Sequence, residues 1–109
     1  MNMRAYYSDT IKNFLEEESN SILGKLTSAH SHRHLEIQQT NAWKIQINIL
    51  KEVFKNNSQG HIFFEFAIPR MGKRVDNIII IGDLIFVIEF KAGDSKYEKH
   101  AIDQVLDYS

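Results

Sequence analysis

Two strongly apolar segments separated by only two residues constrain the fold of this chain most. Segments 74–81 and 84–91 flank Gly82 and Asp83, and most of their residues are Ile, Val, Leu or Phe. A two-residue connection that begins with glycine is typical of a tight β-hairpin turn. The sequence therefore predicts a hairpin. Its two strands are apolar on both faces, which suits central strands of a sheet that is covered on each side.

The short turn also predicts which residues of the two strands lie opposite each other. With a two-residue turn, Ile81 faces Leu84, and counting outward places Asp76 opposite Glu89. Directly opposed side chains share one face of a sheet, with Cβ atoms about 5 Å apart. Two carboxylates in such a position on a largely apolar hairpin repel each other, so we expect a compensating charge beside them.

A divalent cation is the simplest candidate for that charge. Mg²⁺ binds one or two carboxylates and keeps several waters, and such an ion can activate a water and neutralise charge on a phosphodiester. Lys91 follows Glu89 by two residues in the expected strand, so its ammonium projects to the same side, where it can orient a water or stabilise a phosphate. The alternative is a cluster of Asp–Lys and Glu–Arg salt bridges without a metal.

The rest of the chain predicts helices and one more strand. Apolar residues recur at helical spacing in two segments before the hairpin and in one after it. A segment rich in Phe and Ile, ended by Pro69, predicts a further strand. The expected elements are, in order, a helix at residues 7–26, a polar loop at 27–39, a helix at 41–56, a strand at 61–68, the two hairpin strands, and a helix from residue 96 onward.

The order α-α-β-β-β-α predicts an α/β fold. We expect a mixed sheet, antiparallel at the hairpin, with helices on both of its faces. The 109 residues suffice for one small domain or part of one. Residues 1–39 would supply an N-terminal helix and a polar loop, and residues 40–109 would form the core that carries the hairpin.

Charge and composition exclude several classes of protein. The 13 basic and 14 acidic residues give a formal charge of −1, so any binding of nucleic acid depends on a local patch. The chain has no cysteine, which excludes disulfides and thiolate metal sites. It begins without the apolar segment of a signal peptide, and it has no apolar stretch long enough to span a membrane. We therefore expect a cytoplasmic protein with no membrane partner.

The acidic pair and the lysine also match a known motif. Asp76, a hairpin, and then Glu89-Phe90-Lys91 resemble the motif of the PD-(D/E)XK nuclease superfamily. Gln104 and Tyr108 resemble the Gln-x-x-x-Tyr helix motif of its RecB-like branch, and their i, i+4 spacing would put both on one helix face. The resemblance implies a restriction-endonuclease-like core and Mg²⁺- or Mn²⁺-dependent hydrolysis of DNA, or alternatively of RNA. The roles it implies are metal ligation by Asp76, Glu89 and the main-chain carbonyl of Phe90, catalysis by Lys91, and support from Gln104 and Tyr108.

Two features depart from the superfamily pattern. Its members often supply a further acidic ligand from the helix before the sheet, and here the candidates are Glu52 in that helix and Glu65 on the following strand. The superfamily core also has a last strand after its second helix. The sequence ends within the expected helix, so we expect a C-terminally truncated core without that strand.

Residues 64–74 also resemble bacterial proteins in which such a domain precedes a P-loop helicase-like ATPase of the Schlafen type. This resemblance implies that the chain belongs to a larger DNA-processing or phage-defence protein. The partners it implies are nucleic acid, with DNA favoured, and a helicase-like ATPase domain or partner chain. Independently of the resemblance, a homo-oligomer is a further candidate assembly.

Three basic residues lie next to the predicted carboxylate pair. Arg70, Lys73 and Arg74 surround Gly72, and they would bind phosphates at the mouth of the site. Arg74, which the predicted register places opposite Lys91, is the member best placed to reach the scissile phosphate. The alternative is a solvated turn.

Two other candidate sites have simpler interpretations. His30, His32 and His34 alternate along the polar segment and could chelate Zn²⁺ or Ni²⁺, although a solvated loop is favoured. Trp43 could stack on a base, although its position on the apolar stripe of a helix favours the core.

The main rival to a nuclease is a nucleic-acid-binding or regulatory module that keeps the nuclease fold without turnover. The weak third acidic ligand, the near-neutral charge and the missing strand favour this module, whereas the intact trio of Asp76, Glu89 and Lys91 favours the enzyme. A purely structural oligomerisation domain is a third interpretation. It predicts that removing either carboxylate is neutral or stabilising, because repulsion is relieved.

Overall fold

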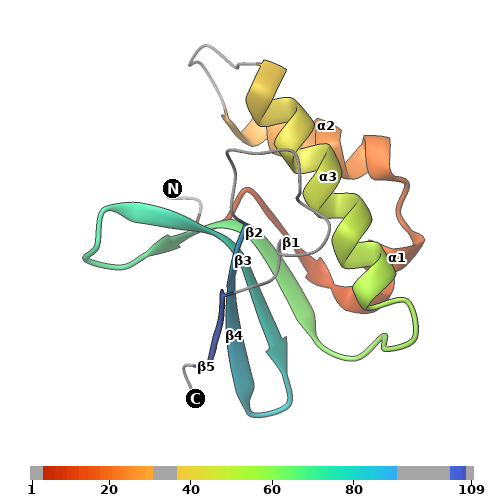
Figure 1. Cartoon of the computed structure of the whole chain (residues 1–109), viewed down its shortest axis with the longest axis vertical. Helices are drawn as coiled ribbons and strands as arrows, with labels where there is room; N and C mark the ends of the chain where they lie inside the picture. The colour runs from red at the N-terminus through yellow and green to blue at the C-terminus, as the bar shows by residue number, and fades with distance from the viewer. Residues whose placement is uncertain (1–3, 31–36, 91–103, 108–109) are drawn as a thin grey trace.

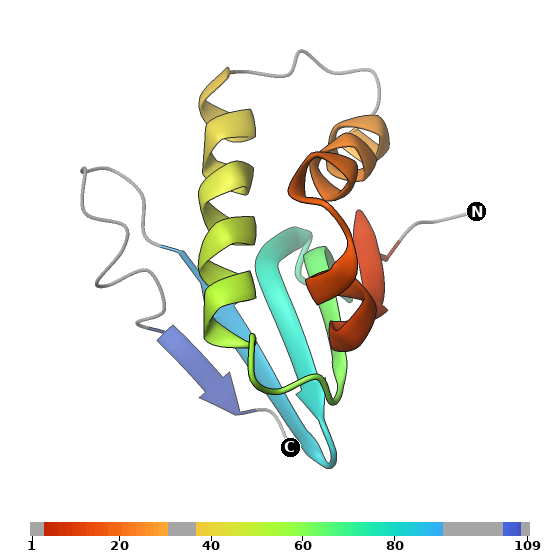
Figure 2. The same ribbon diagram turned by 90° about the vertical axis from the view of Figure 1, so that its right-hand side faces the viewer.

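The computed structural model describes residues 4–30, 37–90 and 104–107 and shows one sheet with helices packed on it (Figure 1, Figure 2). The five strands lie in the order β1-β2-β3-β4-β5, and every pairing is antiparallel. The α/β class is therefore confirmed, whereas the predicted mixed sheet is wrong for the described strands. The elements are β1 (Tyr7–Thr10), α1 (Ile11–Glu16), α2 (Ser19–His30), α3 (Ile37–Val53), β2 (His61–Ile68), β3 (Lys73–Ile81), β4 (Leu84–Glu89) and β5 (Gln104–Asp107).

The predicted hairpin is present as β3 and β4. Ile81 pairs with Leu84, as the two-residue turn requires, and the pairing continues in the predicted register to Asn77 and Ile88. Gly82 has a φ of 60°, which only glycine adopts without steric cost, and this explains why glycine begins the turn. The turn chemistry therefore sets the register of the two central strands.

The N-terminal helix predicted at residues 7–26 is wrong in its first turn. Tyr7–Thr10 instead forms β1, which pairs with β2 at the edge of the sheet. Thr10 then caps α1, its Oγ1 accepting a hydrogen bond from the N–H of Asn13 at 3.1 Å. In this position Tyr7 is buried, and its ring packs edge-on against Phe14 and Phe64. Helical spacing alone does not reveal such a tertiary contact.

The predicted helix is also divided after α1. The ammonium of Lys51, on α3, donates hydrogen bonds to the main-chain carbonyls of Phe14, Leu15 and Glu17, at 2.5, 3.2 and 2.6 Å. The last carbonyls of a helix have no partner within the helix itself. A lysine from a distant helix therefore stabilises the end of α1, and the chain turns there into α2.

The loop predicted at residues 27–39 is shorter than expected. Helix α2 continues to His30, and α3 begins at Ile37, with residues 31–36 outside the described part of the chain. The helix predicted at 41–56 is confirmed from residue 41 to Val53, where α3 ends.

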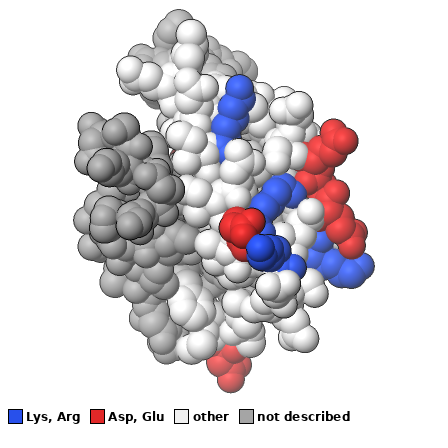
Figure 3. Space-filling view, turned by 45° about the vertical axis from the view of Figure 1, so that its right-hand side comes forward, with Lys and Arg blue, Asp and Glu red and all other residues white. Residues whose placement is uncertain are grey.

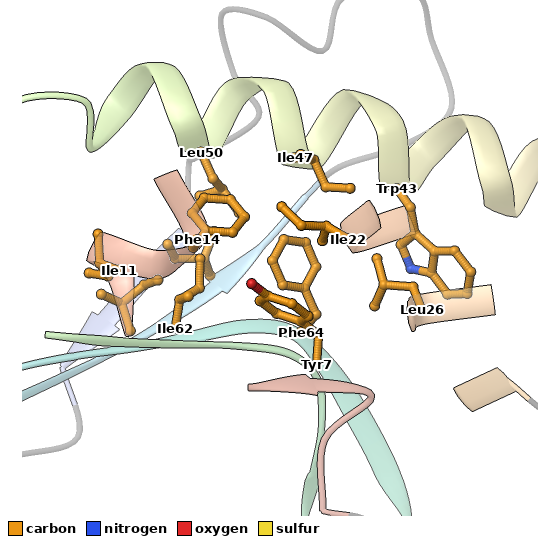
Figure 4. Close-up of a cluster of buried hydrophobic side chains, with 12 residues drawn as sticks. Tyr7, Ile11, Phe14, Ile22, Leu26, Trp43, Ile47, Leu50, Ile62 and Phe64 are labelled. Carbon is orange, nitrogen blue, oxygen red and sulfur yellow. The ribbon is translucent and has the colours of Figure 1, made fainter. Parts of the chain in front are cut away.

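Helices α1, α2 and α3 all lie on the same side of the sheet (Figure 1, Figure 2). Their apolar side chains meet those of the strands in one buried cluster, in which Phe14 and Ile22 lie beside Phe64 (Figure 4). The expectation of helices on both faces is therefore wrong for the helices that the structure describes. The buried members of this cluster are Tyr7, Ile11, Phe14, Ile22, Leu26, Trp43, Ile47, Leu50, Ile62, Phe64, Ile79 and Ile88.

The opposite face of the sheet carries a second buried cluster. Ile78 and Val87 belong to it, whereas the next residue of each strand, Ile79 and Ile88, belongs to the first cluster. This alternation is expected because successive strand residues point to opposite faces. Among the described residues, only β2, β3 and β4 contribute side chains to this second cluster.

Residues 104–107 form β5, where a helix was predicted. Gln104 pairs with Glu89, and Asp107 pairs with Phe86. The predicted helix is therefore wrong at these residues, and the expectation that no strand follows the hairpin is also wrong. Residues 96–103 and Tyr108 lie outside the described part of the chain.

The surface carries charges of both signs. On the face shown in Figure 3, acidic and basic side chains of the described residues lie beside one another, without an extended region of one sign. This agrees with a formal charge of −1. Within the described residues, no helix has the length and apolar character needed to cross a bilayer.

Candidate functional site

The carboxylate of Asp76 marks the point at which the pairing of β3 with β4 ends. The last paired residues are Asn77 and Ile88, so Asp76 and Glu89 follow one step beyond them. Here a side chain joins the two segments, because Oδ2 of Asp76 accepts a hydrogen bond from the main-chain N–H of Phe90 at 2.7 Å. Asp76 is thus fixed against the segment that contains Glu89 and Phe90.

Burial makes the negative charge of Asp76 costly. It is the largest effect in raising the pKa of Asp76 from 3.8 to about 6, while the hydrogen bond from Phe90 N–H acts in the opposite direction. The nearby carboxylates of Glu89 and Glu65 raise this pKa further. Glu89 also raises the pKa of Glu65, so three acidic side chains interact electrostatically with one another. A cation placed among them would relieve both the repulsion and the cost of burial.

Strand β2 changes face next to Asp76. Phe64 packs in the first core cluster, whereas Phe63 and Phe66 both pack with the second, although residues three apart should lie on opposite faces of a regular strand. The residue between Phe64 and Phe66 is Glu65, with a φ of 55°. A positive φ is uncommon for a residue other than glycine, and such strain is concentrated at functional sites.

Strand β3 changes face at the same level. Val75 and Ile78 both belong to the second cluster, although they too are three residues apart. The pairs Phe64–Asn77 and Phe66–Val75 keep the register of β2 and β3 constant across this point, so Glu65 and Asp76 occupy equivalent positions of the two strands. The irregularity in both strands therefore coincides with the two acidic residues.

The change of face lets Glu65 reach α3. Its Oε2 accepts a hydrogen bond from Nε1 of Trp43 at 3.2 Å. Burial is the main cause of a raised pKa of Glu65, while the bond from Trp43 and the charges of Arg74 and His30 act in the opposite direction. Glu65 therefore lies at the sheet–helix boundary beside the candidate site.

Some buried polar side-chain atoms have no hydrogen-bond partner among the described residues. They are Nδ1 of His30, Oε1 of Gln46 and Oδ1 of Asn77. Asn77 directly follows Asp76 and is fully buried, and its Nδ2 donates to the carbonyl of Phe63 at 3.1 Å. Such atoms are rare in folded proteins, and each could form a hydrogen bond with a bound water. Asn77 was not among the predicted site residues. A single Asn between Asp76 and a run of four isoleucines is nevertheless a sequence signal for a buried polar position.

Of the two further acidic candidates, only Glu65 joins the site. Glu52 lies on an exposed part of α3, where its Oε2 binds the ammonium of Lys55 at 2.7 Å and its side chain is 72% exposed. Glu65, in contrast, interacts with both Asp76 and Glu89. The strand residue is therefore the better candidate for an additional acidic ligand.

The basic cluster is divided in the structure. Arg74 lies with its guanidinium carbon 4.5 Å from the ring centre of Tyr6, and its Nη1 donates to the carbonyl of Glu65 at 2.6 Å. Arg70 and Lys73 are exposed at the end of the β2–β3 hairpin. Arg74 thus anchors the hairpin to the N-terminal segment, and Arg70 and Lys73 are accessible to a partner.

Of the predicted site residues that follow Phe90, only the main chain of Gln104 is described. Lys91 and Tyr108 lie outside the described residues. The main chain of Gln104 is described and pairs with Glu89 across β4 and β5. This pairing brings Gln104 to the candidate site from a strand, not from the helix face that was predicted.

Trp43 and His30 take part in the core. Trp43 is 1% exposed, which confirms that it is a core residue and excludes base stacking in this conformation. The ring of His30 lies edge-on to those of Tyr6 and Trp43, each with centres 6.0 Å apart. His30 is thus at the end of α2, not in a solvated loop, and His32 and His34 lie outside the described residues.

The described side chains fit a metal with few protein ligands. No group of three His, Asp or Glu side chains among the described residues is arranged closely enough to hold an ion. Mg²⁺ is commonly held by only one or two carboxylates, with water completing its shell. Asp76 and Glu89 satisfy that requirement in type, and the repulsion between these partly buried carboxylates favours such an ion. Comparison of the chain with protein-family models, with curated proteins and with solved structures finds no match, so the case for a site here rests on this geometry.

Proposed function

We propose that this chain is a nuclease-like domain that hydrolyses phosphodiester bonds of DNA with the help of Mg²⁺ or Mn²⁺. The observation that carries the proposal is the hydrogen bond from the N–H of Phe90 to Oδ2 of Asp76, at 2.7 Å. It joins the first acidic residue of the motif to the main chain of Glu89-Phe90-Lys91. Asp76 and the main chain of Phe90, which are far apart in the motif, are therefore neighbours in space.

Asp76 and Glu89 would hold the metal, with the main-chain carbonyl of Phe90 as a further oxygen ligand. When bound, the ion supplies an activated water and neutralises charge on the phosphate. The burial that raises the pKa of Asp76 also limits competition from bulk water for the same ligand. The N–H of Phe90 orients the Asp76 carboxylate, since it fixes one of its two oxygens.

Lys91 would act on the phosphate. It follows Phe90 directly, and its ammonium would orient the attacking water or stabilise the extra negative charge of the transition state. Glu65 would support the site by adding negative charge near the metal while its own carboxylate is held by Trp43.

A nucleic-acid-binding module without turnover is the second candidate. It is favoured by the lack, among the described residues, of three acidic or histidine side chains arranged around one point. In such a module, the acidic cluster would be a remnant that only lowers stability. The two candidates differ in what a divalent cation does to the protein.

The decisive experiment is thermal unfolding with EDTA, Mg²⁺ or Mn²⁺, combined with cleavage of labelled DNA. We expect the metal to raise the unfolding midpoint of the wild type and to have no effect on Asp76→Asn or Glu89→Gln. Asp83→Asn, at the exposed hairpin turn, is the matched control and should respond as the wild type does. Lys91→Ala should keep the metal response and lose cleavage. An unchanged midpoint with metal, together with no cleavage by the wild type, would favour the binding module.

A further inference from the structure

The β2–β3 hairpin extends beyond the rest of the sheet. Its last pairs are Ala67 with Arg74 and Ile68 with Lys73, and four turn residues, 69–72, connect them. Figure 1 shows this end of the hairpin projecting away from the helices. All residues from 69 to 74 are exposed, and Met71, a large apolar side chain, is 60% exposed. We call Ile68–Lys73 the hairpin tip.

The hairpin tip has a strong local charge. It holds Arg70 and Lys73 and no acidic residue, and Arg74 directly follows it, in a chain whose formal charge is −1. Arg74 is held by Tyr6 and by the carbonyl of Glu65. The side chains of Arg70 and Lys73 make no hydrogen bond or ion pair with the described residues. Two cations that no described residue neutralises therefore flank an exposed methionine.

The backbone at Arg70 is strained. The N–H of Met71 donates to the carbonyl of Ile68 at 3.2 Å, which closes a turn with Pro69 second and Arg70 third. Arg70 has a φ of 70°. The third position of a turn with proline second and a positive φ favours glycine or asparagine. An arginine that occupies it despite the strain indicates a role for its side chain.

We propose that the hairpin tip enters the major groove of duplex DNA, with Arg70 and Lys73 on phosphates and Met71 against the base edges. The choice of nucleic acid as partner rests on the proposed function. The major groove of B-form DNA is about 12 Å wide and admits a two-stranded β-ribbon. The major groove of A-form RNA is too deep and narrow for side chains to read. Proteins that bind single strands present exposed aromatic side chains for stacking, and residues 68–73 contain none.

The position of the tip relative to Asp76 suits a cut close to the contact. Lys73 and Asp76 are three residues apart on the same strand. An extended strand rises about 3.3 Å per residue, so they are separated by about 10 Å. This corresponds to about three base pairs of B-form DNA, at 3.4 Å per base pair. The tip can thus hold the duplex within one helical turn of the candidate site.

The test is the affinity of the chain for a labelled DNA duplex, measured by fluorescence anisotropy in EDTA at several salt concentrations. Arg70→Gly removes a cation and also the strain at this position. We expect it to weaken binding about tenfold and to reduce the slope of log affinity against log salt by about 0.9, the value for one phosphate contact. Its unfolding midpoint in urea should be equal to or higher than that of the wild type. Loss of binding from misfolding would lower that midpoint.

Further variants separate the groove contact from general charge effects. Arg70→Gly with Lys73→Gln should reduce the slope by about 1.8, and Met71→Ser should weaken binding without changing the slope. Lys44 is exposed on α3, away from the hairpin. Lys44→Gln makes the same charge change there and should leave binding unchanged. Equal binding of an RNA duplex or a single strand, or an equal effect of Lys44→Gln, overturns the inference.

The inference and the proposed nuclease can fail separately. Hairpin variants with unchanged affinity in a protein that cleaves DNA would reject the groove contact and keep the nuclease. Hairpin-dependent binding of duplex DNA by a protein that never cleaves it would support the groove contact and reject the nuclease.

Discussion

Oδ2 of Asp76 accepts a hydrogen bond from the main-chain N–H of Phe90 at 2.7 Å, so a partly buried carboxylate links β3 to the end of β4 just where their main-chain pairing ends. A main-chain pair at this position would need no charged group. The carboxylate instead brings negative charge into a partly buried region that already contains Glu65 and Glu89. Such an arrangement lowers stability unless a cation or a proton compensates.

The first prediction concerns pH and Asp76. Because its folded pKa is about 6, above the value of 3.8 expected when unfolded, the folded state binds the proton more tightly. Stability should therefore fall as the pH rises through about 6, and Asp76→Asn should remove this loss. The variant should be more stable than the wild type by up to about 3 kcal/mol at pH 7.5 in EDTA, and nearly equal to it at pH 4. Urea unfolding at a series of pH values measures the difference.

Asp83→Asn, at the exposed turn of the same hairpin, controls for the loss of one negative charge. A stability gain as large in Asp83→Asn as in Asp76→Asn would point to net charge as the cause. Added Mg²⁺ should reverse the order of wild type and Asp76→Asn if the carboxylate binds the ion, because binding to the folded state stabilises it. A structural oligomerisation domain would not show that reversal.

The second prediction uses Trp43, the only tryptophan of the chain. Its indole N–H donates to Glu65, whose pKa is raised mainly by burial. Protonation of Glu65 weakens this charge-assisted bond, so the fluorescence of Trp43 should titrate above the usual range of a glutamate. Glu65→Gln should abolish the transition, whereas Glu52→Gln, exposed on the same helix as Trp43, should leave it intact. A transition that persists in Glu65→Gln would show that another group near the indole is responsible.

The sequence predicts the hairpin of β3 and β4 well because its information is local. A two-residue turn beginning with Gly82 allows one register, and the pairing of Ile81 with Leu84 follows from it. The relation of Asp76 to Phe90 lies one step beyond the paired residues, and it depends on a side chain that takes a main-chain partner. Counting along strands predicts the neighbourhood of Asp76 but not this hydrogen bond.

The missed features depend on contacts between distant parts of the chain. Residues 7–10 have a spacing compatible with a helix, yet they pair with β2 because Tyr7 is buried against Phe14 and Phe64. The change of face at Glu65 requires a positive φ that the residue type does not favour. Strand β5 pairs with β4 although apolar residues in that segment recur at helical spacing. In each case, tertiary pairing outweighs the local pattern.

The third prediction concerns Lys51, which stabilises the end of α1. Its ammonium donates to three main-chain carbonyls, and burial lowers its pKa. Lys51→Met keeps the aliphatic part of the side chain but leaves those carbonyls without this donor. We expect a loss of about 2–3 kcal/mol in the free energy of unfolding, as for hydrogen bonds to charged groups. Lys51→Arg should not restore the loss, because a planar guanidinium cannot reproduce three converging bonds from one nitrogen.

Lys55→Met, in the turn that directly follows α3, is the matched control. Lys55 is 58% exposed and its ion pair is with Glu52, and such exposed pairs contribute at most about 1 kcal/mol. Chemical denaturation of the two methionine variants compares the sites directly. Equal losses would mean that the three carbonyl contacts of Lys51 add nothing beyond an ordinary surface charge.

The last prediction compares two glycines that differ in their surroundings. Gly60 precedes β2 with a φ of 108°, and a Cβ built there would collide with the carbonyl oxygen of Ile80 and lie 2.9 Å from Cγ1 of Ile81. Gly60→Ala should therefore cost at least about 3 kcal/mol, from backbone strain and steric overlap together. Gly24 lies within α2 with no atom within 4 Å of the same added carbon. Gly24→Ala should stabilise the protein by about 0.5–1 kcal/mol, because alanine favours a helix interior. Urea unfolding of both variants tests the packing of the β2 entry against β3, and similar values for the two would contradict that packing.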